Sequence, residues 1–153
     1  MIDKDIRPAT LNDGALLRAW VNADDSLKWK KDTKYLISTN EHLAWLHSRL
    51  ADPFTQIWIA LHNDTPAGQV RLEKKGDFVF VDIYVVAGAR GTGLASFALN
   101  ESINRYTKLF ENEKFCAIVN PENEMSEKLF LKNGFHKEEN EPGYWLKLIR
   151  VSG

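Results

Sequence analysis

The amino-acid sequence predicts a single mixed α/β (α+β) domain, and two observations support this prediction. Three apolar, β-branched segments separated by short turns lie between residues 56 and 86, which is typical of an antiparallel meander. After residue 90 the apolar spacing changes from two to three or four, and helical and strand-like segments then alternate. The resulting element order is β-α-α-β-β-β-α-β-α-β-β. A chain of 153 residues fits one domain, residues 1–153.

The N-terminal segment is expected to form a strand followed by a helix. Residues 5–8 open the strand, and Thr10 and Asp13 mark the start of the helix. Its apolar residues keep helical spacing: Leu16, Leu17, Trp20 and Val21. The polar residues 22–34 are predicted to be irregular.

A second helix is predicted from a capping box, in which Ser38 is followed three residues later by Glu41. Its apolar face is expected to carry Leu43, Leu46 and Leu50. Asp52 stands before a proline and ends the helix.

The predicted meander consists of strands at 56–62, 66–74 and 78–86, with turns at 63–64 and 75–77. A helix of about four turns or more then starts at Arg90 or Thr92. The remaining predicted elements are a strand buried on both faces, a helix that stops at Gly134, and two strands that close as a hairpin: residues 115–119, 121–133, 135–139 and 144–149.

Composition narrows the range of partners. The net charge is −1, from 20 basic and 21 acidic side chains, and no block of like charge stands out. We therefore expect no nucleic-acid or membrane partner. The one cysteine, Cys116, excludes an intramolecular disulfide framework and is expected to be a buried hydrophobe. No apolar run has signal-peptide or membrane-spanning character, so a cytoplasmic location is expected.

The glycine-rich segment 88–93 can be compared with three phosphate motifs. A triphosphate loop would need Lys-Ser/Thr where Leu94 and Ala95 stand, and a dinucleotide fingerprint would need Gly or Ala at Ser96. Two interpretations remain. The backbone N–H groups at the helix start hold a pyrophosphate that two glycines allow to approach, or the segment only connects a strand to a helix.

Two motifs together give the chain a family resemblance. Residues 90–95 read Arg-Gly-Thr-Gly-Leu-Ala after a strand, which resembles the acetyl-CoA signature of the GNAT acetyltransferases. Residues 120–135, with Asn123, Ser126 and a terminal Gly-Phe, are similar to that family's second motif. The resemblance implies the GNAT fold, a mixed and mostly antiparallel sheet of about seven strands with about four helices. It also implies acetyl-CoA as co-substrate and N-acetyl transfer to an amine.

The resemblance assigns a role to each cofactor-binding residue. The pyrophosphate would be held by the backbone N–H groups of Arg90, Gly91, Thr92, Gly93, Leu94 and Ala95. Val85 and Val86 would pair with the pantetheine arm through free backbone amides. Asn123 would bond the pantetheine, and Ser126 and Lys132 would reach CoA phosphates. For Asn123 and Ser126 the alternative is helix capping and a solvated face.

One position departs from the family pattern. Phe130 stands where the family usually has a tyrosine that protonates the departing thiolate. Because an alkyl thiol has a pKa of about 8.5, the thiolate is a fair leaving group, and this change weakens catalysis without forbidding it. Water, Tyr84 and Tyr144 are the alternatives for the acid that protonates the thiolate in place of that tyrosine.

The reaction also needs a base, because an ammonium must lose a proton before it attacks. Asp82 is the first candidate, since it interrupts an apolar strand and shares a face with Tyr84. The alternative is an outward-facing or salt-bridged aspartate. Glu73 and Glu122 are weaker candidates.

The acceptor region is similar to that of GNAT enzymes that acetylate nucleotide-linked amino sugars, as in the pseudaminic acid pathway. The matching residues include Trp20, Asn22, His42 and Trp45, of which the first three are expected to bind substrate. For His42 and Trp45, surface and core positions are the alternatives. His42 and His47 are five apart, which does not suit a helical metal site, so no metal is expected.

Three functional hypotheses follow. The first is direct acetylation of a primary amine on a UDP-linked amino sugar. The second is acetylation of a protein N-terminus or another small amine, and the third is a non-catalytic acyl-CoA-binding module. The expected partner is a small-molecule amine, and the chain is expected to be a monomer or homodimer.

Overall fold

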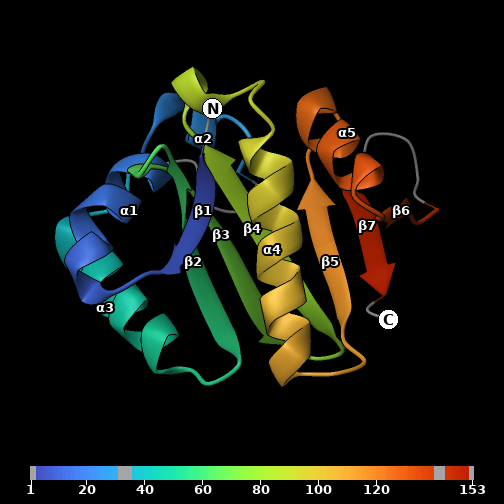
Figure 1. The fold of residues 1–153 in the computed structure, drawn as a ribbon, viewed down its shortest axis with the longest axis horizontal. Coiled ribbons are helices and arrows are strands. Elements are labelled where there is room, and N and C mark those ends of the chain that lie inside the picture. The colour runs from blue at the N-terminus through green and yellow to red at the C-terminus, as the bar shows by residue number, and fades with distance from the viewer. Residues whose placement is uncertain (1–2, 31–35, 140–143, 152–153) are drawn as a thin grey trace.

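The computed structural model describes residues 3–30, 36–139 and 144–151 and contains one mixed sheet with helices on both faces (Figure 1). Seven strands follow the order β1-β2-β3-β4-β5-β7-β6. Their bounds are β1 Lys4–Pro8, β2 Thr55–His62, β3 Thr65–Lys75, β4 Phe78–Val85, β5 Lys114–Val119, β6 His136–Lys137 and β7 Leu146–Val151. The predicted fold class and the antiparallel meander β2-β3-β4 are confirmed.

Five α-helices are present in the described residues, one more than predicted. They are α1 Gly14–Val21, α2 Asp24–Leu27, α3 Thr39–Ala51, α4 Leu94–Leu109 and α5 Glu124–Lys132, with 3-10 turns at Leu11–Asp13 and Ala87–Ala89. The extra helix, α2, lies in the segment predicted to be irregular. A single four-residue turn is too short to show helical periodicity.

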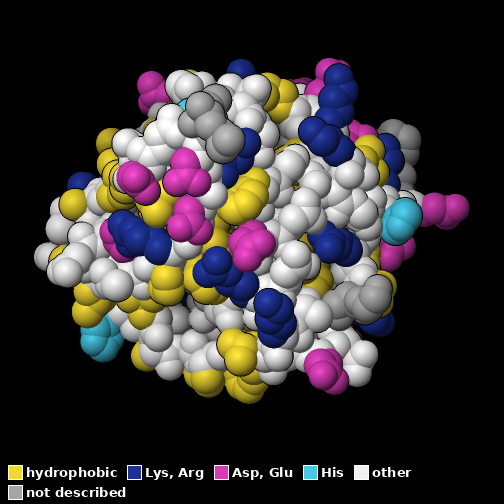
Figure 2. All heavy atoms as spheres, viewed as in Figure 1, with side chains coloured by type: hydrophobic (Ala, Val, Ile, Leu, Met, Phe, Trp, Pro, Cys, Tyr) yellow, Lys and Arg dark blue, Asp and Glu magenta, His cyan; other side chains and the backbone are white. Residues whose placement is uncertain are grey.

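The larger core lies between α4 and the sheet. Strand residues Val79 and Leu72 and helix residues Leu99 and Tyr106 are all fully buried there. The predicted apolar spacing of this helix is therefore confirmed, although the helix begins at Leu94. On the face seen in Figure 2, basic and acidic side chains are interspersed, in keeping with the net charge of −1.

A second core lies on the opposite face, where α1 and α3 pack on β2. Leu17, Trp20 and Leu46 meet Ile57 and Ile59 there. The predicted face of α3 is partly wrong, because Leu43 is 45% exposed and His42 is buried instead.

Strands β4 and β5 are parallel neighbours over only part of their length. The pairing joins Val79 to Phe115 and Phe80 to Cys116 and then stops. Beyond these residues the two strands separate toward the end where α4 begins (Figure 1). The prediction that 115–119 is buried on both faces is therefore wrong at Ile118, which is 37% exposed, while Cys116 is buried as expected.

The C-terminal elements agree with the predicted order. α5 ends at Lys132, two residues before the predicted stop at Gly134, whose φ of 89° is left-handed. The Phe135 amide bonds back to the Phe130 carbonyl at 3.1 Å. β6 and β7 are antiparallel, as the hairpin requires, whereas its predicted turn at 140–143 lies outside the described residues. Within the described residues, no helix has both the length and the apolar character needed to span a membrane.

Candidate active site

A cavity of about 1000 Å³ occupies the place where β4 and β5 separate. Its walls come from the glycine loop and the start of α4, from the ends of β4 and β5, from the start of α5, and from α1 to α3. One continuous space therefore joins the expected pyrophosphate cradle to the expected acceptor region.

The glycine loop has the backbone that its sequence suggests. Gly91 and Gly93 have φ values of 75° and 86°, which residues with a Cβ rarely adopt. The Arg90 amide bonds the Ala87 carbonyl at 3.2 Å, and the Leu94 amide meets the Thr92 hydroxyl at 3.3 Å. Among described residues, no acceptor pairs with the amides of Gly91, Gly93 or Ala95, so these amides fit an anion.

A cation from the other end of the chain lies beside this loop. The Lys4 Cε lies 3.6 Å from the point where a Cβ on Gly93 would stand. Lys4 belongs to β1, is not among the described residues that line the cavity, and is part of no sequence motif. The signal is non-local, since 89 residues separate Lys4 from Gly93.

The expectation that both backbone amides are free is wrong at Val86. The Val86 amide is not free, because it donates to the Ala67 carbonyl of β3 at 2.9 Å. Backbone groups alternate along a strand, so the Val85 amide faces the opposite edge, toward the gap beside β5. The Val85 carbonyl already accepts a bond of 3.0 Å from the Arg90 side chain.

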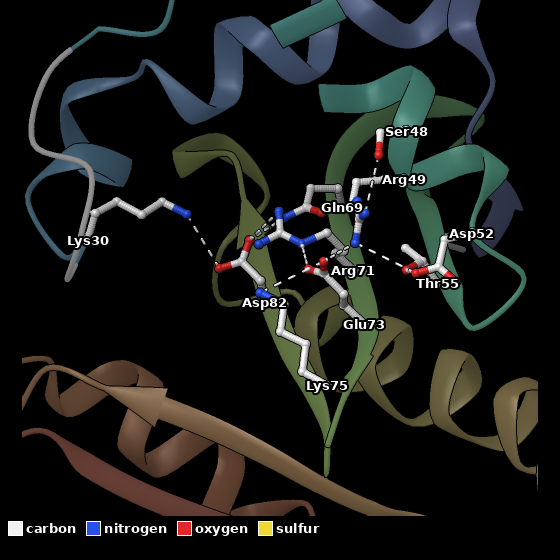
Figure 3. Close-up of polar contacts among 10 residues, drawn as sticks. All are labelled: Lys30, Ser48, Arg49, Asp52, Thr55, Gln69, Arg71, Glu73, Lys75 and Asp82. Atoms are coloured by element: carbon white, nitrogen blue, oxygen red, sulfur yellow. Dashed lines mark hydrogen bonds and ion pairs between the residues drawn. The ribbon is translucent and has the colours of Figure 1, made fainter. Parts of the chain in front are cut away.

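Asp82 and Tyr84 lie on the same face of β4 and both line the cavity, as their spacing predicts. The Asp82 carboxylate meets Lys30 Nζ at 3.4 Å, Gln69 Nε2 at 3.0 Å and Arg71 Nη1 at 3.8 Å (Figure 3). Burial raises the pKa of Asp82, but Lys30 and Arg71 outweigh burial and bring that pKa to about 2. Asp82 is thus ionised and salt-bridged at neutral pH.

Glu73, the weaker base candidate, belongs to an ionic network that shares Arg71 with Asp82. Its side chain is only 9% exposed, and its carboxylate bonds Arg49, with Arg71 at 3.5 Å and Lys75 at 3.8 Å (Figure 3). Glu122 is exposed and is not among the described residues that line the cavity. Asp82 is therefore the better placed of the three carboxylates.

The Tyr84 hydroxyl has a fixed partner. It donates to Asp25 of α2 at 2.9 Å, and the other Asp25 oxygen accepts a 2.6 Å bond from Arg90. Burial, the hydrogen bond to Asp25 and the Asp25 charge raise the pKa of Tyr84, so the phenol is protonated at neutral pH. Tyr144 is 61% exposed and does not line the cavity among the described residues.

The second-motif residues line the opposite side of the cavity, where Asn123 also caps α5. Its side chain accepts from the Ser126 amide at 3.2 Å and donates to the Ser126 hydroxyl at 3.0 Å. Ser126 and Lys132 line the cavity as well. Phe130 is 3% exposed and packs against Phe135, with ring centroids 5.0 Å apart.

The acceptor side of the cavity is rich in tryptophan. Trp20 and Trp45 line it, with two tryptophans that the sequence motifs do not single out, Trp29 and Trp145. Trp45 packs under the Arg71 guanidinium, whose carbon lies 5.0 Å from the ring centroid. This wall suits a ring-shaped or planar ligand.

Two of the expected substrate residues differ in their surroundings. His42 lines the cavity, lies 5.3 Å from the Trp45 ring, and is held neutral because burial and the charges of Arg18 and Arg71 lower its pKa. Asn22 is not among the described lining residues, and its amide bonds both backbone groups of Ile37, at 2.8 and 3.0 Å. Asn22 therefore has a structural role here.

Across residues 3–30, 36–139 and 144–151, no cluster of three or more His, Cys, Asp or Glu side chains is arranged to hold a metal ion.

Comparison with known proteins identifies relatives of this chain. Residues 5–136 match the family model of the acetyltransferase (GNAT) domain. No curated protein sequence matches the chain. A domain from Methanocaldococcus jannaschii is 22% identical, with a TM-score of 0.85, and the alignment covers 99% of this chain and 100% of that one.

Two further solved structures contain coenzyme A. RimL, a ribosomal L7/L12 alpha-N-protein acetyltransferase in complex with coenzyme A, is 14% identical, with a TM-score of 0.79 and 97% and 93% of the two chains covered. AAC(6')-Ib, an aminoglycoside acetyltransferase, in complex with ribostamycin and coenzyme A, is 19% identical, with a TM-score of 0.80 and the same coverage. At identities this low, the structural similarity shows that the proteins share a fold.

Proposed function

The chain belongs to the GNAT acetyltransferase family, and on that premise we propose that it transfers the acetyl group of acetyl-CoA directly to a primary amine. The observation that carries this proposal is the single cavity at the opening between β4 and β5. That cavity joins the glycine-loop amides, which have no acceptor in the described part of the chain, to the carboxylate of Asp82.

In this proposal the glycine loop holds the pyrophosphate of the co-substrate. The amides of Gly91, Gly93 and Ala95 lie at the start of α4, where the helix dipole favours an anion. Lys4 lies beside the loop and adds a positive charge. The Val85 amide faces the gap and would donate to the thioester carbonyl, stabilising the oxyanion that forms there.

We propose that Asp82 binds the ammonium group of the acceptor and accepts its proton. A carboxylate with a pKa of about 2 is a weak base while Lys30 and Arg71 face it. An acceptor ammonium that displaced Lys30 would form an ion pair with Asp82 and then give up its proton to it. Tyr84, protonated and held by Asp25, lines the cavity, and we assign it the role of the acid that replaces the missing tyrosine at Phe130.

For the acceptor we propose an amino sugar linked to a nucleotide. Tryptophan side chains line the acceptor wall, and aromatic faces suit sugar rings and bases. Arg71 lies over Trp45 beside the cavity and supplies a cation for a phosphate. A relative with the same fold, AAC(6')-Ib, has been solved with ribostamycin, which shows that the fold accommodates an aminoglycoside in that protein.

An acceptor panel with acetyl-CoA, monitored by the release of free thiol, tests this function. We expect thiol release with UDP-linked amino sugars and little release with peptides. Thiol release with peptide N-termini alone would mean that the acceptor is a protein N-terminus and not an amino sugar. Tight binding of coenzyme A without acetylation of any acceptor would mean that the chain is a non-catalytic acyl-CoA-binding module.

A further inference from the structure

The acceptor position beside Asp82 is already filled by an amine of the chain itself. Lys30 Nζ lies 3.4 Å from Asp82 Oδ1, and the Lys30 side chain is 25% exposed (Figure 3). Gln69 and Arg71 approach the other carboxylate oxygen. Lys30 therefore holds the place that the proposed function gives to the acceptor ammonium.

The same amine shares a cavity with the donor side. Lys30, Asp82, Val85 and Gly91 all line one cavity. Asp82 and Val85 are three strand residues apart, which is about 10 Å along β4. The flexible four-carbon side chain of Lys30 lets its amine leave Asp82 and move toward the donor side within this cavity.

We propose that Lys30 is an acetylation site that the protein modifies itself, in an intramolecular transfer from bound acetyl-CoA. This inference rests on the proposed acetyl transfer. The ammonium of Lys30 loses one proton to Asp82 and then to solvent. Its nitrogen bonds the acetyl carbonyl carbon, the carbon–sulfur bond breaks, and a second proton from the nitrogen ends on the sulfur as coenzyme A thiol.

Acetylation of Lys30 would also change the site. It converts the ammonium into a neutral amide and so removes one of the two cations that face Asp82. The modified amine would no longer compete with an external acceptor ammonium for this carboxylate.

The test incubates the full chain with acetyl-CoA and no other amine, followed by peptide mass spectrometry. We expect Lys30 to gain an acetyl group at least about tenfold faster than the exposed Lys28, because a positioned amine reacts as if highly concentrated. The rate should not depend on protein concentration, and the difference should vanish in urea. Lys30→Arg should abolish this signal, whereas Lys28→Arg should leave it.

Modification of Lys30 no faster than Lys28, or at a rate proportional to protein concentration, would overturn the inference. The acceptor panel separates the two ideas. Thiol release with external amines while Lys30 stays unmodified contradicts the self-acetylation alone. Failure of both assays contradicts the proposed function as well.

Discussion

Arg90 and Asp25 form an ion pair of 2.6 Å although 65 residues separate them. The same Asp25 carboxylate accepts the Tyr84 hydroxyl, and Arg90 also binds the Val85 carbonyl. One aspartate of α2 therefore links the acceptor side of the cavity to the glycine loop and to the end of β4. The geometry of the proposed donor and acceptor sites is coupled through this carboxylate.

Asp25→Asn should lower kcat/KM about tenfold, since the loss of charge-assisted hydrogen bonds costs about 1.5 kcal/mol. It should also lower the pKa of Tyr84, because the Asp25 bond and charge, together with burial, raise that pKa. The alkaline limit of activity should then move to lower pH. Ultraviolet titration, compared with Tyr84→Phe, measures the change. Asp24→Asn, at an exposed neighbour, is the control, and a Tyr84 pKa that Asp25→Asn leaves unmoved would contradict this link.

Asp82→Asn should lower kcat/KM by about 10²–10⁴, the range expected for loss of a general base. The exposed Asp77→Asn, on the turn between β3 and β4, should leave kcat/KM unchanged. Because the Asp82 pKa is about 2, its carboxylate stays ionised above about pH 4. If kcat/KM falls as the pH is lowered from neutrality, the group that titrates is therefore the acceptor amine and not Asp82. Undiminished turnover of Asp82→Asn from about pH 6 to about pH 9 would remove Asp82 from the mechanism.

Gly91→Ala should weaken binding of coenzyme A and lower the free energy of unfolding by about 1–2 kcal/mol, because the φ of 75° is left-handed. Gly88→Ala is a matched control. At both glycines the position of an added methyl group is open, with no atom beyond the chain neighbours within 4 Å, but Gly88 lacks a positive φ. Calorimetric titration with coenzyme A compares the two variants. Equal affinities would mean that the loop only connects β4 to α4.

Asp13→Asn should lower the free energy of unfolding by about 1–3 kcal/mol, because it removes the carboxylate from a two-bond pair with Arg7, at 2.8 and 2.9 Å. The bond to Arg7 holds the pKa of Asp13 below its ordinary value. This stabilisation is present above the unfolded pKa of about 3.9 and is lost as pH falls through the folded pKa. Urea unfolding at neutral and acid pH should show the difference between variant and wild type shrinking in acid. A difference in the free energy of unfolding that stays the same at both pH values would contradict an ionic origin of this stabilisation.

Local patterns predicted most of the fold. Alternation identified the meander, and the change of period at the glycine loop identified α4, because these signals depend only on neighbouring residues. The exposure of Ile118 could not be predicted, since it follows from the separation of β4 and β5, which are distant in the sequence. The short α2 had no periodic signal because it spans only one turn.

At the candidate site, too, local patterns predicted some residues, whereas residues with distant partners were missed. Asp82 and Tyr84 were predicted to share a face because strand side chains alternate, and they do. Asp25 and Lys30 escaped prediction because their partners lie 59 and 52 residues away. Asn22 was expected to bind substrate but bonds the Ile37 backbone, a contact that no motif shows.

A crystal structure with bound acetyl-CoA tests the central claim most directly, through the position of the thioester carbonyl. We expect that carbonyl within hydrogen-bonding distance of the Val85 amide in the gap between β4 and β5, on the side open to Asp82. The pyrophosphate should lie against the amides of Gly91, Gly93 and Ala95. A thioester turned away from Asp82, or a co-substrate bound outside this gap, would contradict the account.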